Sequence, residues 1–193
     1  MAIDFMVMPL SRYLAGDFVT PQMRTAWDSG VPYFILGPQG RRDFPKGVPF
    51  GGPEAAVQRA RFVPMVVEDL ARLPIPRGAW DEASNAEPVF HRVDPVAYEA
   101  LLHHLATSER SLVDLLPWKP NREHARASLL LPCDFPKVVS MTSPFERQVA
   151  SVPRALEVLT SRAWAGELAA AAVTLLDALR DAQRLRLPLV VDR

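Results

Sequence analysis

Short apolar runs bounded by proline or glycine recur along the chain, and they predict strands. Residues Ile3 to Met8 form a nearly continuous apolar run, which is the pattern of a buried strand. The runs at residues 128–131 and 138–141 flank the segment PCDFPK, and we expect the two strands to pair as a hairpin. The runs after the first predict strands at residues 31–36, 89–93, 128–131, 138–141 and 189–191.

Helices are predicted between these runs by their start signals. Thr20-Pro21 and Asp94-Pro95 each place a capping side chain before a proline at the first helical position, which favours a helix start. A further helix is expected over residues 53–61, and Pro64 should end or kink it, because proline removes a backbone donor, before residues 65–73 continue it. The first two signals predict helices over residues 21–27 and 95–106.

The last third of the chain is predicted to be mostly helical. Ser143-Pro144-Phe145-Glu146 has the form of a capping box, in which the serine oxygen and the glutamate carboxylate each accept a hydrogen bond from a backbone N–H. We therefore expect a helix to start there and to restart at Ser151. It should continue to about Leu185, with Gly166 as a place where it could break.

These elements predict an α+β fold. We expect one globular domain over residues 1–193, with a small mixed sheet of about five or six short strands packed against several helices. Hydrophobic residues make up 49 % of the chain and charged residues 23 %, a composition that suits a folded core. The helical last third is expected to lie across one face of the sheet.

Charge and cysteine content exclude several classes of protein. The formal net charge is zero, so the chain lacks the basic surface on which binding to nucleic acid depends. The single Cys133 excludes an internal disulfide and a thiolate-rich zinc site. Asp4 stands where an export signal has basic residues, and the longest apolar stretch, 168–176, is about half a membrane span. We expect a cytoplasmic protein without a membrane partner.

The segment GPQGRRDFPKGVPFGGPE, residues 37–54, is the most unusual stretch. A phosphate-binding loop is disfavoured because Pro38 deletes a backbone donor and no Lys-Ser or Lys-Thr pair follows. Two interpretations of the segment are left: a surface loop, or an arm that binds another protein. Loop 74–88 is a second surface of this kind. Aromatic and guanidinium groups are enriched at binding hot spots, and the predicted partner-binding residues are Arg41, Arg42, Phe44, Phe50 and Trp80.

Candidate catalytic groups are few and lack a recognisable motif. Glu99 and His103 are four residues apart on a predicted helix and share a face, but two ligands are too few for a metal site. His91 and Cys133 are the other candidates, and Cys133 is more typical of a small buried hydrophobe. The loop carboxylates Asp81, Glu82 and Glu87 are expected to be solvated. We therefore expect neither a metal nor a cofactor, and no enzymatic activity.

The layout resembles the bacterial immunity proteins that neutralise polymorphic toxins delivered between cells. The features that carry the resemblance are VMPLSRY near the N-terminus, the loop PQGRRDFPKGVPFGG, the segment SPFE and the ending LPLVVDR. The resemblance implies a non-enzymatic protein that occludes the active site of a cognate toxin, and it carries over no functional residue. Two alternatives stay open: a small hydrolase or transferase that uses His91, His103 or Cys133, and a chaperone or adaptor for a secreted effector.

Overall fold

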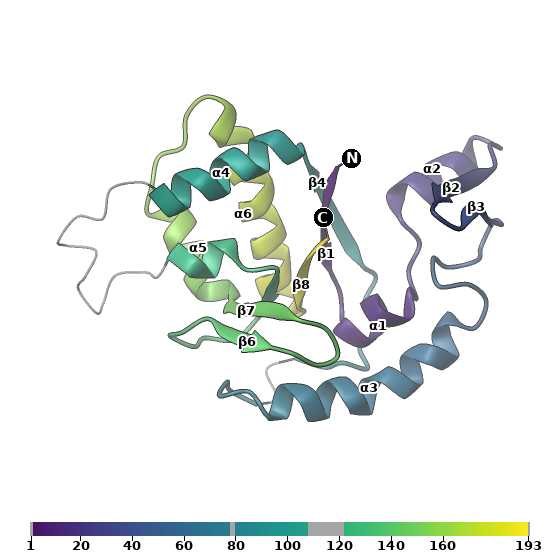
Figure 1. The fold of residues 1–193 in the computed structure, drawn as a ribbon, viewed down its shortest axis with the longest axis horizontal. Helices are drawn as coiled ribbons and strands as arrows, with labels where there is room; N and C mark the ends of the chain where they lie inside the picture. Colours follow the sequence, from purple (N-terminus) through teal and green to yellow (C-terminus); the bar gives the residue numbers. More distant parts are fainter. Residues whose placement is uncertain (1, 78–79, 108–121, 193) are drawn as a thin grey trace. The chain divides into compact units, whose positions relative to one another are not determined.

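The structure is a computed structural model that describes residues 2–77, 80–107 and 122–192. Its contacts divide the chain into two compact units (Figure 1). The sheet unit consists of Met1–Met8, Glu68–Asp81 and Ala86–Arg193, and the hairpin unit consists of Pro9–Val67 and Glu82–Asn85. Helices and a mixed sheet occur together, so the predicted α+β class is confirmed. A single domain stays a prediction.

A mixed sheet of six described strands forms the centre of the sheet unit. Its order is β4-β1-β8-β5-β7-β6, and all neighbours are antiparallel except β5 and β7, which are parallel. Phe5 on β1 pairs with His91 on one side and with Val191 on the other. The strands are β1 (Ile3–Val7), β4 (Val89–Val93), β5 (Leu129–Leu131), β6 (Val139–Met141), β7 (Arg147–Ser151) and β8 (Leu189–Asp192).

Three helices form the main hydrophobic core with this sheet. They are α4 (Pro95–Thr107), α5 (Val152–Thr160) and α6 (Glu167–Leu185), and Figure 1 shows them grouped beside the strands. The rings of Phe5 and Tyr98 meet edge to face at 5.2 Å, an arrangement that stabilises buried aromatic pairs. Ala171 and Ala172 on α6 are fully buried in this core. Small side chains at these positions allow α6 to pack closely.

Three predicted helix starts are confirmed by their capping bonds. The Thr20 hydroxyl oxygen accepts a hydrogen bond from the N–H of Met23 at 3.2 Å, at the start of α2 (Pro21–Asp28). The Asp94 carboxylate accepts from the N–H of Ala97 at 3.0 Å. The Ser151 hydroxyl accepts from the N–H of Arg154 at 3.2 Å. Each bond satisfies a backbone donor that the first turn of a helix leaves unpaired.

The predicted helix at residues 143–146 is wrong. The Ser143 hydroxyl donates to the Asp69 carboxylate at 2.8 Å, and the following residues enter strand β7. β7 pairs with β5 on one edge and with β6 on the other, so its backbone groups are satisfied by two strands that were predicted, in a pairing that the capping signal does not reveal. Burial of Val149 and Ala150 between these neighbours outweighs a local capping signal. The helix starts at Val152 instead.

The predicted hairpin between β5 and β6 is also wrong, because β7 lies between them. Val149 of β7 is the register partner of Leu129 on β5 and of Val139 on β6. The two strands therefore belong to the same sheet without touching as neighbours.

The hairpin unit contains a second, two-stranded sheet. The predicted loop 37–54 is wrong in its first part, because residues 40–44 form strand β3 and pair with β2. Charged residues concealed this strand from the hydrophobic pattern. Helix α3 runs through Pro64 without ending there. The elements of the unit are α1 (Leu10–Ala15), α2, β2 (Tyr33–Gly37), β3 (Gly40–Phe44) and α3 (Ala55–Ala71), whose last residues belong to the sheet unit.

Close backbone contacts fix the end of the segment 37–54. The N–H of Gly51 donates to the carbonyl oxygen of Gly16 at 2.8 Å. The N–H of Phe50 donates to the carbonyl oxygen of Phe18, also at 2.8 Å. A Cβ atom on Gly51 would lie 1.9 Å from the carbonyl oxygen of Ala15. Only glycine fits this approach of two backbones.

Glu82 is a buried cap within the hairpin unit, so its predicted solvation in loop 74–88 is wrong. Its carboxylate accepts hydrogen bonds from the N–H groups of Leu10 at 3.2 Å and Ser11 at 2.9 Å, at the start of α1. The Ser11 hydroxyl donates to the Glu82 carbonyl oxygen at 2.8 Å. Burial of this residue, which is 4 % exposed, is therefore matched by two hydrogen bonds to its carboxylate and one to its carbonyl oxygen.

Arg59 on α3 is buried beside the same segment. Its guanidinium donates to the Asp17 carboxylate and to the Asn85 side-chain oxygen, both at 3.2 Å. It also donates to the carbonyl oxygens of Ala83, at 3.1 Å, and Ser84. Residues 82–85 thus connect α1 and α3 through buried polar contacts.

Among the described helices, none is both long and apolar enough to cross a membrane.

We predict that Glu82→Ala lowers the free energy of unfolding by about 1–3 kcal/mol, because two backbone donors of α1 lose their buried acceptor. Denaturant unfolding monitored by circular dichroism measures the change. Asp28→Ala, which removes an exposed carboxylate at the end of α2 in the same unit, is the control and should change stability by less than about 0.5 kcal/mol. Equal losses in the two variants would contradict the capping role of Glu82.

Candidate functional site

The β2–β3 hairpin carries most of the predicted partner-binding residues. Arg41 and Arg42 lie on β3, Phe44 ends it, and Phe50 follows in the loop. Trp80 is half-buried and belongs to the sheet unit. The hairpin unit therefore contains four of the five residues, and Trp80 is not among them.

The two phenylalanines contribute to the interior of the hairpin unit. Phe50 stacks between Phe18 and Phe44, with ring centroids 5.5 Å and 5.4 Å apart. Phe18 and Phe44 are buried. The Trp27 indole N–H donates to the Phe44 carbonyl oxygen at 2.9 Å. These rings anchor β3 and the loop after it to the rest of the unit.

The two arginines lie over aromatic rings and remain exposed. The Arg42 guanidinium lies 4.9 Å from the Phe44 ring centroid and donates to the Phe50 carbonyl oxygen at 2.6 Å. The Arg41 guanidinium lies 4.1 Å from the Phe34 ring centroid and pairs with Asp43 at 2.7 Å. Stacking on rings leaves the guanidinium charge available to a partner.

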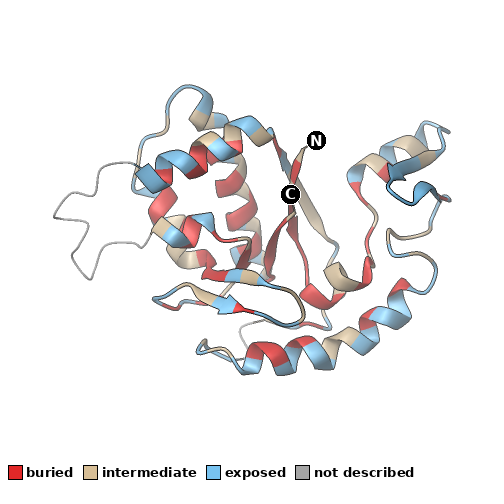
Figure 2. Cartoon of the chain, viewed as in Figure 1, coloured by how far each residue is buried: buried red, intermediate tan, exposed pale blue. Residues whose placement is uncertain are grey.

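Exposed apolar side chains on and beside β2 were missed from the sequence. Figure 2 shows the hairpin region as largely exposed. Leu36 is 73 % exposed and Phe34 is 43 % exposed, values that are unusual for large apolar residues on a strand. Val31 and Ile35 are exposed as well. An apolar run looks the same in sequence whether its strand is buried or exposed, so no signal distinguished this case.

An open pocket of about 490 Å³ lies next to the hairpin. Trp27, Tyr33 and Phe44 provide aromatic walls, and Arg41 and Lys46 provide positive charge. Asp43, the other charged residue of the lining, is paired with Arg41. The pocket and the exposed side chains of β2 together form an apolar surface with a positive rim, which we call the hairpin surface.

The three residues of the alternative catalytic hypothesis are not brought together. His91 on β4 lies with its Nε2 atom 3.0 Å from the Asp181 carboxylate on α6. The Arg184 guanidinium and His91 both lower the pKa of Asp181, Arg184 more strongly. His103 lies exposed on α4. Among the described residues, no group of three or more histidine, cysteine or carboxylate side chains could hold a metal.

Cys133 is buried after β5. Burial, with a smaller contribution from the charge of Asp134, raises the pKa of the thiol to about 11. The thiolate is the reactive form of cysteine. This environment is that of a structural cysteine.

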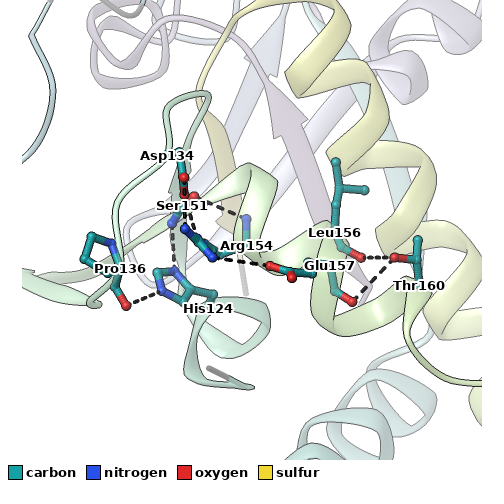
Figure 3. Close-up of polar contacts among 8 residues, drawn as sticks. All are labelled: His124, Asp134, Pro136, Ser151, Arg154, Leu156, Glu157 and Thr160. Atoms are coloured by element: carbon teal, nitrogen blue, oxygen red, sulfur yellow. Dashed lines mark hydrogen bonds and ion pairs between the residues drawn. The ribbon is translucent and has the colours of Figure 1, made fainter. Parts of the chain in front are cut away.

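His124 is a buried histidine that the sequence analysis did not select. It lies on the 3-10 helix η2 (Arg122–Arg126), and its Nδ1 atom accepts a hydrogen bond from the Ser151 N–H at 3.0 Å (Figure 3). Its Nε2 atom lies 3.3 Å from the Pro136 carbonyl oxygen. Because Nδ1 accepts, the proton of the neutral ring is on Nε2. Desolvation by burial lowers the pKa of His124, which favours the neutral ring.

The contacts around His124 are structural in form. His124 bonds to the backbone N–H of Ser151, whose hydroxyl oxygen caps α5, so the two side chains are not arranged as base and nucleophile. Beside them, the Arg154 guanidinium pairs with the Asp134 carboxylate at 2.6 Å and 3.0 Å. Figure 3 shows these contacts joining η2, the segment after β5, and the start of α5.

Comparison of the chain with protein-family models, curated protein sequences and solved structures gives no match.

We predict that Cys133 in the folded chain reacts slowly with a disulfide-exchange reagent at pH 8. A thiol pKa of about 11 in place of 9.0 lowers the thiolate fraction about a hundredfold, and burial slows access further. Absorbance of the released thiol measures the rate, with the chain in guanidinium chloride as the control. Comparable rates in the two conditions would contradict the buried environment and favour a reactive cysteine.

We predict that the folded chain loses stability as the pH falls below 6.5 because of His124. Its pKa in the folded chain lies below the ordinary value of 6.5 for histidine, so the unfolded chain binds more protons in this window. One such proton changes the free energy of unfolding by at most about 1.4 kcal/mol per pH unit. Denaturant unfolding at pH 7.5 and pH 5.5 measures the loss.

The control for this prediction is His124→Gln, which cannot titrate in this range. The variant should be less stable at pH 7.5 and should show a smaller loss between the two pH values. An equal loss in both chains would assign the pH dependence to other groups.

Proposed function

We propose that this chain is a protein-binding protein that acts by forming a stoichiometric complex, and that its partner is a toxin whose active site it occludes. The observation that carries the binding part is the hairpin surface, where Phe34 and Leu36 are exposed beside two arginines. Aromatic and guanidinium groups next to apolar side chains are typical of binding hot spots. The toxin as partner is supported by the resemblance to immunity proteins.

The charge and shape of the hairpin surface support a macromolecular partner. Its pocket is open and combines aromatic walls with cations, and the apolar side chains of β2 extend the surface beyond the pocket. Large exposed apolar patches on folded proteins mark sites of interaction. A partner that covers Phe34 and Leu36 would remove this apolar surface from water.

The first test identifies the partner. The full chain, carrying an affinity tag, is purified from its native host, and mass spectrometry identifies a protein present in equimolar amount. The proposal expects that adding one equivalent of the chain abolishes the catalytic activity of this protein. An unaffected partner activity would contradict toxin neutralisation and favour the adaptor hypothesis.

The second test locates the surface. We predict that Phe34→Ser with Leu36→Ser weakens the complex at least about tenfold, because an apolar anchor of this kind contributes on the order of 1–2 kcal/mol. The matched control is Val96→Ser with Val173→Ser, two exposed valines of the sheet unit, which should leave the dissociation constant unchanged. Isothermal titration calorimetry measures both. Equal affinities of the two double variants would place the interface elsewhere.

A further inference from the structure

Strand β2 has one unpaired edge in the part of the chain that the structure describes. The small sheet contains β2 and β3 alone, with Gly37 paired to Gly40 around the turn Pro38-Gln39. A two-stranded sheet is marginal by itself, and an unpaired edge presents N–H and C=O groups that can pair with another chain. This edge is therefore a place where a further strand could be added.

The register of β2 and β3 indicates which backbone groups face outward. A two-residue turn is closed by a hydrogen bond between its flanking residues, and hydrogen-bonded pairs alternate along an antiparallel ladder. Since Gly37 and Gly40 flank the turn, Ile35 pairs with Arg42 in the bonded class. We therefore expect the N–H groups of Phe34 and Leu36 to point away from β3.

β2 lacks the features that protect exposed edges in folded proteins. Its sequence YFILG has no charge and no proline, and Phe34 and Leu36 are exposed. Charged side chains normally prevent edge-to-edge pairing. β3, in contrast, carries Arg41, Arg42 and Asp43, and its end is fastened by the Phe44 contacts. The less protected edge of the hairpin is therefore that of β2.

The charge around this edge is positive. Arg41, Arg42 and Lys46 lie on β3 or directly after it, against the single carboxylate of Asp43. The hydrogen bond of Arg42 goes to a neutral carbonyl oxygen, so no carboxylate of the hairpin balances its charge. A second copy of the chain would bring like charges together, whereas an acidic strand would complement them.

We propose that β2 accepts an extended segment of the partner protein as an additional strand, and that this segment alternates apolar with acidic side chains. Main-chain hydrogen bonds to the Phe34 and Leu36 edge provide the register. Apolar side chains lie on the face of Phe34 and Leu36, and the alternate carboxylates lie on the opposite face, which is the face of Arg42. The inference rests on the proposed function and names the chemistry of the segment that the hairpin surface binds.

The test begins with a phage-displayed library of random twelve-residue peptides, selected on the purified full chain and counter-selected on Leu36→Pro. We expect enriched peptides to alternate apolar residues with aspartate or glutamate and to lack proline at the centre. A basic consensus would overturn the proposal. So would the absence of any peptide that prefers the unaltered chain. The selection uses no cellular partner, so its failure is distinguishable from a failure to find a toxin.

The best peptide is then synthesised as a series in which each residue in turn carries an N-methyl group. In a strand added to β2, only alternate N–H groups face β2. Methylation at every second position should therefore weaken binding at least tenfold, and methylation between them should have little effect. Fluorescence anisotropy measures the affinities on the unaltered chain, so no variant has to fold. An effect without this alternation would overturn strand addition.

Two further measurements separate the backbone edge from other occupants. Leu36→Ala keeps the outward N–H and should bind the peptide more tightly than Leu36→Pro, whereas equal losses would assign binding to the side chain. Sedimentation of the chain alone should show a monomer. A dimer that Leu36→Pro dissociates would show that a second copy occupies the edge, and the proposal would be wrong.

Discussion

The hairpin unit depends on two opposite charges that are buried within it and satisfied by the same short segment. An unpaired charge in a protein interior costs several kcal/mol. The Glu82 carboxylate avoids this cost by accepting from the first N–H groups of α1. The Arg59 guanidinium avoids it through Asp17 and the oxygens of residues 83–85. These contacts join α1 and α3, which no hydrophobic run in the sequence would bring together.

The same unit has a small apolar interior, and this limits what it can cover. Phe18, Phe44 and Phe50 form a stack that, with the Trp27 hydrogen bond, attaches β3 and the following loop. β2 is attached through its pairing with β3 and the contact of the Tyr33 ring with Phe44, and its side chains Phe34, Ile35 and Leu36 stay exposed. The anchored strand is thus charged and the outer strand is apolar. Folded proteins usually place charged side chains on a free edge strand, which prevents pairing with other chains, and the hairpin has the opposite arrangement.

Local sequence signals predicted helices correctly where a side chain accepts a hydrogen bond from a backbone N–H group a few residues further along the chain. Thr20 and Asp94 cap helices as expected, and β4 has the predicted bounds. The capping motif at Ser143 failed because pairing with β5 and β6 made the residues after it a strand. β3 was missed because three of its five residues are charged, so it lacks the apolar pattern from which strands were predicted.

The candidate site was predicted in part, for reasons of the same kind. Arg41 and Arg42 were selected by residue type, and the structure exposes both beside aromatic rings. Phe34 and Leu36 were not selected, since exposure of an apolar strand depends on what packs against it. The burial of Glu82 and the contacts of His124 likewise depend on segments that are distant in sequence.

Several groups able to do chemistry are engaged in holding the sheet unit together. His124 and Ser151 satisfy backbone donors, Arg154 pairs with Asp134, and burial raises the pKa of Cys133 to about 11. Replacing the buried groups among them, His124, Ser151 and Cys133, would weaken the fold before it changed any surface. The side chains of β2 differ, because their exposure leaves apolar area in contact with water and brings no stability to the folded chain. A surface of that kind is explained most simply by a partner that covers it.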